Sequence, residues 1–73
     1  MINNTLSERI FEQLKNDILA GVYKPGDRLL YEMIATKLDV SLTPVKEALL
    51  RLEQEGLVKT MPRKGTYVTQ LTN

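Results

Sequence analysis

The sequence predicts a mainly α-helical domain in which three helices are followed by a small β-hairpin. Three stretches, residues 6–20, 31–38 and 45–55, repeat apolar residues at the spacing of one helix face. After residue 56 the pattern changes, and β-branched and aromatic residues surround a short loop that contains a glycine. The length of 73 residues allows at most one small domain with a modest core.

The first helix is predicted over residues 6–20. Thr5 and Glu8 have the spacing of a capping box, in which each side chain binds the backbone N–H of the other residue. Gly21 is a natural C-terminal stop, because glycine readily adopts the left-handed backbone that ends many helices. The apolar stripe that we expect to face the core consists of Leu6, Ile10, Phe11, Leu14, Ile18 and Leu19.

A connector and a second helix follow. Pro25 and Gly26 are typical of the two central positions of a type II turn. Residues 28–30 form a short strand or an extended entry, and residues 31–38 form the second helix. Asp39 ends this helix, at some cost, because a left-handed backbone is less favourable for a residue with a Cβ. The residues expected to face inward are Ile34, Ala35 and Leu38.

A third helix is predicted to end near residue 55, before Gly56. Ser41 or Thr43 caps its start. Pro44 limits where the helix begins, because proline fits only the first turn, where its missing N–H would have no partner. The buried stripe of this helix comprises Val45, Ala48, Leu49 and Leu52.

Two strands, residues 57–61 and 66–71, are predicted after the third helix, joined by the loop Pro62-Arg63-Lys64-Gly65. Three helices followed by a basic-tipped hairpin are the layout of a winged helix-turn-helix. The helix-turn-helix then covers about residues 31–55 and the wing about residues 57–71. We expect one domain over residues 1–73, ordered from about residue 6 to residue 71.

The residue inventory excludes several classes of site. The chain has no cysteine and no histidine, which excludes a disulfide, a thiolate zinc site and a Cys or His nucleophile. No glycine-rich phosphate loop with its lysine is present, so we expect no catalytic residue, cofactor or metal. No apolar run approaches the roughly 20 residues that span a bilayer. No secretory signal is apparent, and we expect a cytoplasmic protein without a membrane partner.

The distribution of charge is more informative than the net charge of +1. Residues 1–40 hold five basic and six acidic side chains, whereas residues 41–73 hold five basic and three acidic ones. In the second part, Lys59, Arg63 and Lys64 have no acidic neighbour in sequence. Local positive charge of this kind favours attraction to phosphate.

Five residues at the start of the third helix are candidates for contact with double-stranded DNA. A helix-turn-helix places this part of its recognition helix in the major groove, where side chains and free backbone N–H groups meet bases and phosphates. The alternative is that the hydroxyl residues only cap the helix, although capping and contact are compatible. The candidates are Ser41, Leu42, Thr43, Pro44 and Lys46.

The wing and the second helix supply further candidates. The wing tip, Arg63, Lys64, Gly65 and Thr66, is expected on phosphates or in the minor groove, and the alternative is an ordinary solvated hairpin. Near the second helix, Arg28 and Tyr31 either touch the DNA backbone or are a surface charge and a partly packed ring.

Arg51 has Glu47 and Glu55 four residues away on either side. An ion pair within the third helix is therefore expected for Arg51, in preference to DNA contact.

Five short motifs, spread from Ile10 to Val68, occur in an order and spacing that are specific together. They are Ile18-Leu19-Ala20-Gly21, Pro25-Gly26-Asp27-Arg28-Leu29, Val40-Ser41-Leu42-Thr43-Pro44-Val45-Lys46-Glu47-Ala48-Leu49, Arg51-Leu52-Glu53-Gln54-Glu55-Gly56-Leu57-Val58 and Gly65-Thr66-Tyr67-Val68. On these motifs the sequence resembles the DNA-binding domain of GntR-family bacterial transcriptional regulators, most of all the FadR-type (FCD) branch.

The resemblance implies a ligand-controlled repressor or activator that binds a near-palindromic operator as a homodimer. In such proteins a helical C-terminal domain makes the dimer and binds a small-molecule effector, sometimes with a metal. Because the chain stops at Asn73, about where the linker to that domain would begin, we expect the effector site to lie outside this chain.

The sequence departs from the family pattern at positions that bear on DNA reading. The family usually has arginine where this chain has Leu42 and Lys46, and Leu42 cannot form the two-point contact with guanine that arginine makes. It can instead touch a thymine methyl, so we expect an operator with less guanine reading at this position. Tyr31 and Met33 replace acidic residues that are common in the second helix, and Asp39 replaces a glycine.

Two other functions compete with DNA binding. A winged-helix fold can also serve as a protein–protein interaction module. Acidic replacements on the third helix and the wing would favour that function, and Lys46, Arg63 and Lys64 argue against it. A small enzyme is the second rival, and the lack of His, Cys and a phosphate loop argues against it.

Overall fold

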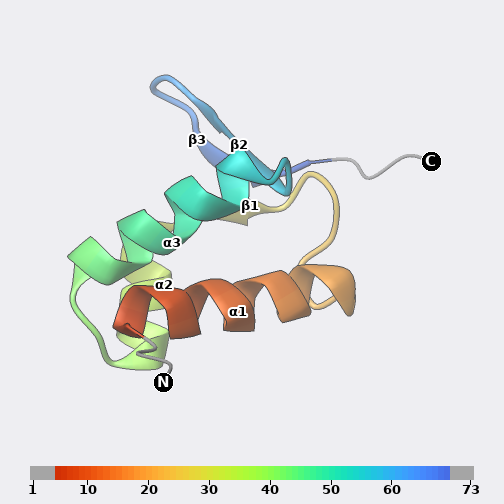
Figure 1. Ribbon diagram of the computed structural model, residues 1–73. Coiled ribbons are helices and arrows are strands. Elements are labelled where there is room, and N and C mark those ends of the chain that lie inside the picture. The colour runs from red at the N-terminus through yellow and green to blue at the C-terminus, as the bar shows by residue number, and fades with distance from the viewer. Residues whose placement is uncertain (1–4, 70–73) are drawn as a thin grey trace.

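A computed structural model describes residues 5–69 of the chain. Three helices pack together at one side of the molecule, and a small sheet lies against the C-terminal half of the third helix (Figure 1). In chain order the elements are α1 (Leu6–Leu19), β1 (Arg28–Leu29), α2 (Tyr31–Leu38), α3 (Leu42–Gln54), β2 (Val58–Met61) and β3 (Gly65–Val68). Within the described residues, every helix is too short or too polar to cross a lipid bilayer.

The core forms mainly where α1 packs against α3. All four residues of the predicted α3 stripe are buried, and so are Ile34 and Ala35 of α2, while Leu38 is half-buried. The α1 stripe is narrower than predicted, because Leu6 is 46% exposed and Leu19 61% exposed. Both lie near an end of the helix. The remaining stripe residues, which the core does bury, are Ile10, Phe11, Leu14 and Ile18.

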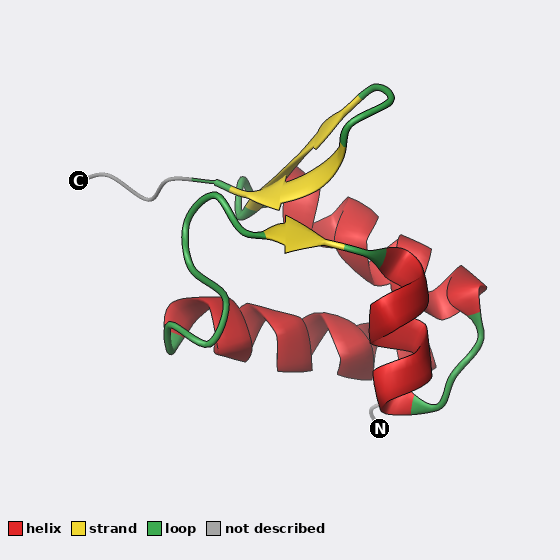
Figure 2. Ribbon diagram, turned by 180° about the vertical axis from the view of Figure 1, so that it is seen from behind, coloured by secondary structure: helices red, strands yellow, loops and turns green. Residues whose placement is uncertain are grey.

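The sheet has three antiparallel strands in the order β1-β3-β2 (Figure 2). The predicted hairpin is present as β2 and β3, with slightly shorter strands than expected. The second strand ends at Val68, one residue before the end of the described chain, and residues 70 and 71 of its predicted extension lie outside the described residues. Of the two alternatives for residues 28–30, the structure shows a strand at Arg28–Leu29, which pairs with the far side of β3. This pairing ties the entry of α2 to the wing.

The connections between elements use the predicted turn residues. The Asp27 N–H donates to the Lys24 carbonyl at 2.9 Å, and Gly26 has a φ of +91°, as the type II turn requires. At the end of α2, Asp39 adopts the left-handed backbone with a φ of 57°. The Val40 N–H donates to the Ala35 carbonyl, which completes a Schellman motif and sets the direction in which the chain enters α3.

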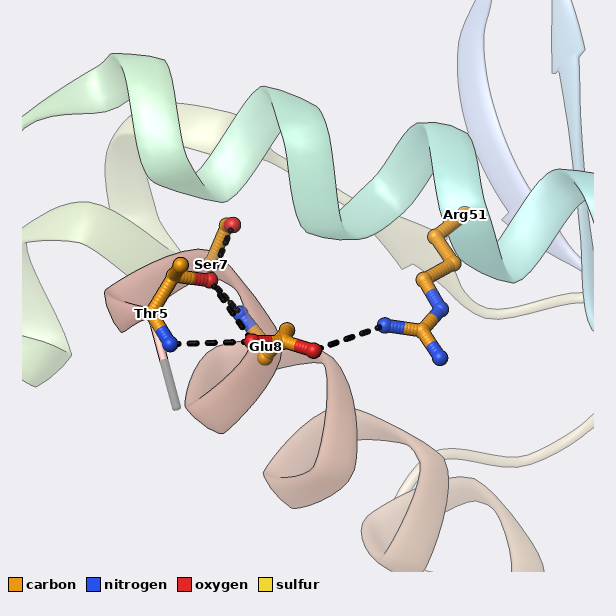
Figure 3. Close-up of polar contacts among 4 residues, drawn as sticks. All are labelled: Thr5, Ser7, Glu8 and Arg51. Carbon is orange, nitrogen blue, oxygen red and sulfur yellow. Dashed lines mark hydrogen bonds and ion pairs between the residues drawn. The ribbon is translucent and has the colours of Figure 1, made fainter. Parts of the chain in front are cut away.

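The predicted capping box is present at the start of α1 (Figure 3). The Glu8 N–H donates to the Thr5 hydroxyl at 3.1 Å, and the Thr5 N–H donates to the Glu8 carboxylate at 2.9 Å. Glu8 also lies 3.8 Å from the Arg51 guanidinium, which stacks 4.2 Å from the centroid of the Phe11 ring. The expected pairing of Arg51 within α3 is therefore wrong, because the close packing of α1 on α3 offers it an aromatic ring and another carboxylate.

Glu8 predicts an acid-dependent loss of stability. The hydrogen bonds that the Thr5 backbone and side chain donate to its carboxylate lower the pKa of Glu8 below the ordinary value of 4.5, and Arg51 adds to this effect. Because the pKa is lower in the folded state, the stabilisation is fully present above pH 4.5 and is lost as the pH falls through the lowered pKa.

We therefore expect Glu8→Ala to lower the melting temperature at pH 7. Towards pH 2 the melting temperatures of the variant and the wild type should become equal. Thermal melts followed by circular dichroism measure both. The exposed Glu12, one turn further along α1, is the matched control for substitution by alanine. An equal difference in melting temperature between Glu8→Ala and wild type at both pH values would contradict the stabilising role of the ionised Glu8 carboxylate.

Candidate nucleic-acid interface

The start of α3 is exposed and carries no side-chain cap. Ser41 occupies the N-cap position, as one of the two predicted alternatives, but its side chain makes no capping hydrogen bond. Thr43 and Pro44 lie inside the first turn, which contains no acidic residue. The backbone N–H groups of this turn and the helix dipole therefore make the end of α3 favourable for an anion. Leu42, Thr43 and Lys46 are exposed beside them.

Lys46 lies on the ring of Tyr31. Its Nζ is 5.8 Å from the ring centroid, within the range of a cation–π contact. Tyr31 is the first residue of α2, and its ring is partly buried against the core. The contact joins the first turn of α2 to the second turn of α3, which are the two helices of the helix-turn-helix.

A short chain of hydroxyl groups connects Tyr31 to the wing. The Tyr31 hydroxyl lies 3.4 Å from the Thr66 Oγ1, which in turn lies 3.1 Å from the Thr60 Oγ1. Thr66 is only 2% exposed, because its side chain points to the inner face of the sheet. The predicted contact between the Thr66 side chain and phosphate is therefore wrong. Thr66 is a structural residue, and the alternation of a strand places its hydroxyl on the opposite face from its neighbours.

The wing tip is a tight turn that displays two cations. The Lys64 N–H donates to the Met61 carbonyl at 3.1 Å, and Pro62 and Arg63 are the two central residues. Arg63 has a φ of 67°, a left-handed conformation that is costly for a residue with a side chain. The side chains of Arg63 and Lys64 are both exposed. The hydroxyl of Tyr67 donates to the Lys64 carbonyl at 3.0 Å and supports the turn.

Arg28 belongs to the wing more than to α2. The register places it opposite Tyr67 on β3, and its guanidinium lies across Gly65. A Cβ at Gly65 would come within 2.8 Å of the Arg28 Nε, and the φ of Gly65 is +115°, so only glycine fits there without a shift. The lack of a side chain at Gly65 thus leaves space for the Arg28 guanidinium along the wing.

Lys59 is not among the contacts predicted from the sequence, although it is one of the cations without an acidic neighbour. It lies opposite Tyr67 on the other side of β3, so Arg28 and Lys59 flank the same aromatic residue on the exposed face of the sheet. Strand alternation could have placed Lys59 on the exposed face. Its position across Tyr67 from Arg28 depends on the pairing of β1 with β3, which only the structure shows.

The start of α3, the first turn of α2 and the wing tip lie on one side of the molecule. In both ribbon views the hairpin leans back over α3, so that its tip lies nearer the N-terminal end of α3 than its base does (Figure 1, Figure 2). We call this surface the candidate DNA face. We assign to it the predicted contact residues of these segments, Tyr31, Ser41, Leu42, Thr43, Pro44, Lys46, Arg63, Lys64 and Gly65. Arg28 is included because its guanidinium lies against Gly65.

The cations of the candidate DNA face are not neutralised within the protein. Over residues 5–69, ion pairs within 4 Å join Lys15 to Glu55 and Arg51 to Glu8. Both pairs are partly exposed and join α1 to α3 or to its C-cap residue Glu55. Arg28, Lys46, Arg63 and Lys64 take no part in them, so their charges remain available to an external anion.

The fold and this face define a winged helix-turn-helix domain, and solved structures agree. A crystal structure of a GntR-family transcriptional regulator from Pseudomonas syringae superposes with a TM-score of 0.83 at 36% identity, over 90% of this chain and 28% of that one. Among curated proteins, the uncharacterized HTH-type transcriptional regulator YdhC of Bacillus subtilis is 39% identical over 88% of this chain. The HTH-type transcriptional repressor YtrA of the same organism is 36% identical over 86% of it.

The profile of the bacterial regulatory proteins of the gntR family matches residues 6–68. The chain therefore belongs to the GntR family and has the fold of its helix-turn-helix domain. It spans 29% of the length of YdhC and 49% of that of YtrA. The FadR-type branch suggested by the sequence motifs is not confirmed, since the relatives include YtrA, of which the matched segment is 49%.

Proposed function

We propose that this chain is the sequence-specific DNA-binding domain of a bacterial transcriptional regulator. The observation that carries the proposal is the candidate DNA face, where an uncapped helix start and four unpaired cations lie on one side of the domain. In this arrangement α3 enters the major groove, while Arg63 and Lys64 hold the flanking backbone or the minor groove. The names of YdhC and YtrA, both HTH-type transcriptional regulators, support the same function.

The regulator acts as a homodimer on a near-palindromic operator. Two copies of α3 then bind two half-sites. Binding of the first copy raises the effective concentration of the second at its half-site, which increases the overall affinity. A small-molecule effector binds outside this chain, which spans 29% of the length of YdhC. The rival protein-interaction module is less well supported, because the exposed residues of the face other than Leu42 are basic or polar and none of them is acidic.

A selection experiment tests this function directly. The domain, fused to a dimerising helix, is selected against randomised duplex DNA at two salt concentrations. We expect an enriched palindromic motif whose affinity falls steeply with salt, because binding releases the counterions of the contacted phosphates. Absence of both enrichment and low-salt binding would favour the protein-interaction module instead.

Leu42→Arg is expected to shift base preference toward guanine. Leu42 is exposed in the first turn of α3, where an arginine can donate two hydrogen bonds to guanine O6 and N7, worth about 1–3 kcal/mol of discrimination. The same selection experiment measures the change in base frequency at the contacted position. Leu42→Gln, which extends the side chain without a charge, is the control. Unchanged base frequencies for the arginine variant would contradict the placement of Leu42.

Arg63→Gly is expected to make the domain more stable and to weaken its binding to DNA. Glycine relieves the left-handed backbone at this position, which should raise the free energy of unfolding by up to about 1 kcal/mol. Loss of a phosphate contact should lower the slope of log affinity against log salt by about one unit. Arg63→Ala is the matched control, because it removes the charge and keeps the strained backbone. Binding equal to wild type in both variants would remove Arg63 from the interface.

A further inference from the structure

Tyr31 provides an aromatic surface for Lys46, the lysine in the second turn of α3. The Lys46 Nζ lies 5.8 Å from the centre of the ring, while the side chain of Lys46 remains exposed. A lysine on an open helix surface samples many rotamers, and a ring beneath its ammonium group favours a subset of them. The ring thus restricts where the charge of Lys46 is held.

The ring itself is fixed from two sides. It packs against the hydrophobic core, and its hydroxyl lies 3.4 Å from the Thr66 Oγ1. Thr66 is buried and bound to Thr60 of the neighbouring strand. Tyr31 is therefore held by core packing and by its contact with Thr66, although it stands at the edge of the candidate DNA face.

An aromatic ring holds a cation without cancelling its charge. A carboxylate in this place would form an ion pair with Lys46 and compete with phosphate or base oxygens for it. Among the described residues, no carboxylate lies within 4 Å of the Lys46 Nζ, and Glu32, the next residue after Tyr31, makes no ion pair with it. The full charge of Lys46 is thus both oriented and available.

We propose that Tyr31 is a positioning residue that orients the Lys46 ammonium group for a base edge in the major groove, and that it acts through Lys46 and not by its own contact with DNA. The inference rests on the proposed DNA-binding function. It replaces the sequence-based expectation that Tyr31 contacts the DNA backbone, because the Tyr31 hydroxyl is directed toward Thr66.

The test is a double-mutant cycle of Tyr31→Leu and Lys46→Ala, with affinity measured on the selected operator. Tyr31→Leu should weaken binding roughly 2- to 5-fold, the range of an exposed cation–π contact, and should relax base preference at one position. In the Lys46→Ala background the same substitution should have no further effect. Tyr31→Phe keeps the ring and should restore wild-type affinity to within about twofold.

Tyr31→Glu tests whether Lys46 must keep its full charge as well as its orientation. The carboxylate should pair with Lys46, lower affinity more than leucine does, and reduce the salt slope by about one unit. Thermal melts of each variant show whether the fold is retained. In the free domain, the Lys46 ε-methylene protons should resonate upfield in wild type and Tyr31→Phe, and should lose this ring-current shift in Tyr31→Leu.

Each outcome decides a different question. If the wild-type domain binds no DNA, the proposed function fails and the inference fails with it. If wild type binds and Tyr31→Leu binds equally well with the same base preference, the inference alone is overturned. An equal loss from Tyr31→Leu with and without Lys46 also overturns it, because Tyr31 would then act independently of that lysine.

Discussion

Leu52→Ala is expected to remove nearly all of the domain's stability, so that a large fraction of the protein is unfolded at ambient temperature. Leu52 lies in α3, is 0% exposed and belongs to the core that joins α1 to α3. Truncation of a fully buried leucine costs about 3–5 kcal/mol, since it removes apolar contacts and leaves a cavity. A core in a domain of fewer than about 80 residues supplies only about 3–5 kcal/mol of net stability. The two quantities are similar in size, so the net free energy of unfolding should fall close to zero and about half of the protein should be unfolded.

Urea or thermal denaturation followed by circular dichroism measures this loss. Leu50→Ala is the matched control, because Leu50 is two residues away on the same helix and is 57% exposed. A surface substitution of this kind should change the free energy of unfolding by no more than about 0.5 kcal/mol. Equal effects of the two substitutions would mean that α3 does not face the core as described.

Lys46→Ala should produce the largest single loss of DNA affinity among substitutions that leave the fold intact. Lys46 is exposed and unpaired, and Tyr31 is the aromatic surface that orients it. Loss of a charged base contact should cost about 1–2 kcal/mol, or roughly 5- to 30-fold in Kd, and should alter preference at the base it reads. Equilibrium titration of labelled operator duplexes with single-base changes measures both quantities.

Lys24→Ala is the control for charge alone. Lys24 is exposed in the connector between α1 and β1, which lies away from the start of α3 and from the wing tip (Figure 1). The Lys24→Ala substitution should reduce the affinity for DNA only slightly and should leave base preference unchanged. If Lys24→Ala and Lys46→Ala weaken binding alike and without regard to sequence, Lys46 contributes only net charge and does not read bases.

The helices follow closely from patterns within a few residues of sequence. The capping box at Thr5 and Glu8, the proline in the first turn of α3 and the glycines after α1 and α3 place the helix ends within a residue or two. These signals are local because a helix forms its hydrogen bonds between residues four apart. The apolar period predicts the buried side of α3 completely, and it overestimates the stripe of α1 only at its ends.

The candidate DNA face is only partly predictable. The exposed start of α3 and the basic wing tip follow from the order of helices, turn and hairpin. The burial of Thr66 was not foreseen, because it depends on which face of β3 packs inward. The partner of Arg51 was predicted wrongly for a related reason, since a residue 43 positions earlier in the chain, Glu8, competes with its helical neighbours.

The sequence by itself determined the kind of elements, their order and the residues that end them, together with the family to which the chain belongs. The tertiary structure decided which distant residues meet. Pairing of β1 with β3 brings Arg28 onto the wing, and the approach of α2 to α3 places Tyr31 under Lys46. Local patterns report hydrogen bonds and burial within one element. Contacts between elements depend on how their faces pack together, and no short stretch of sequence contains that information.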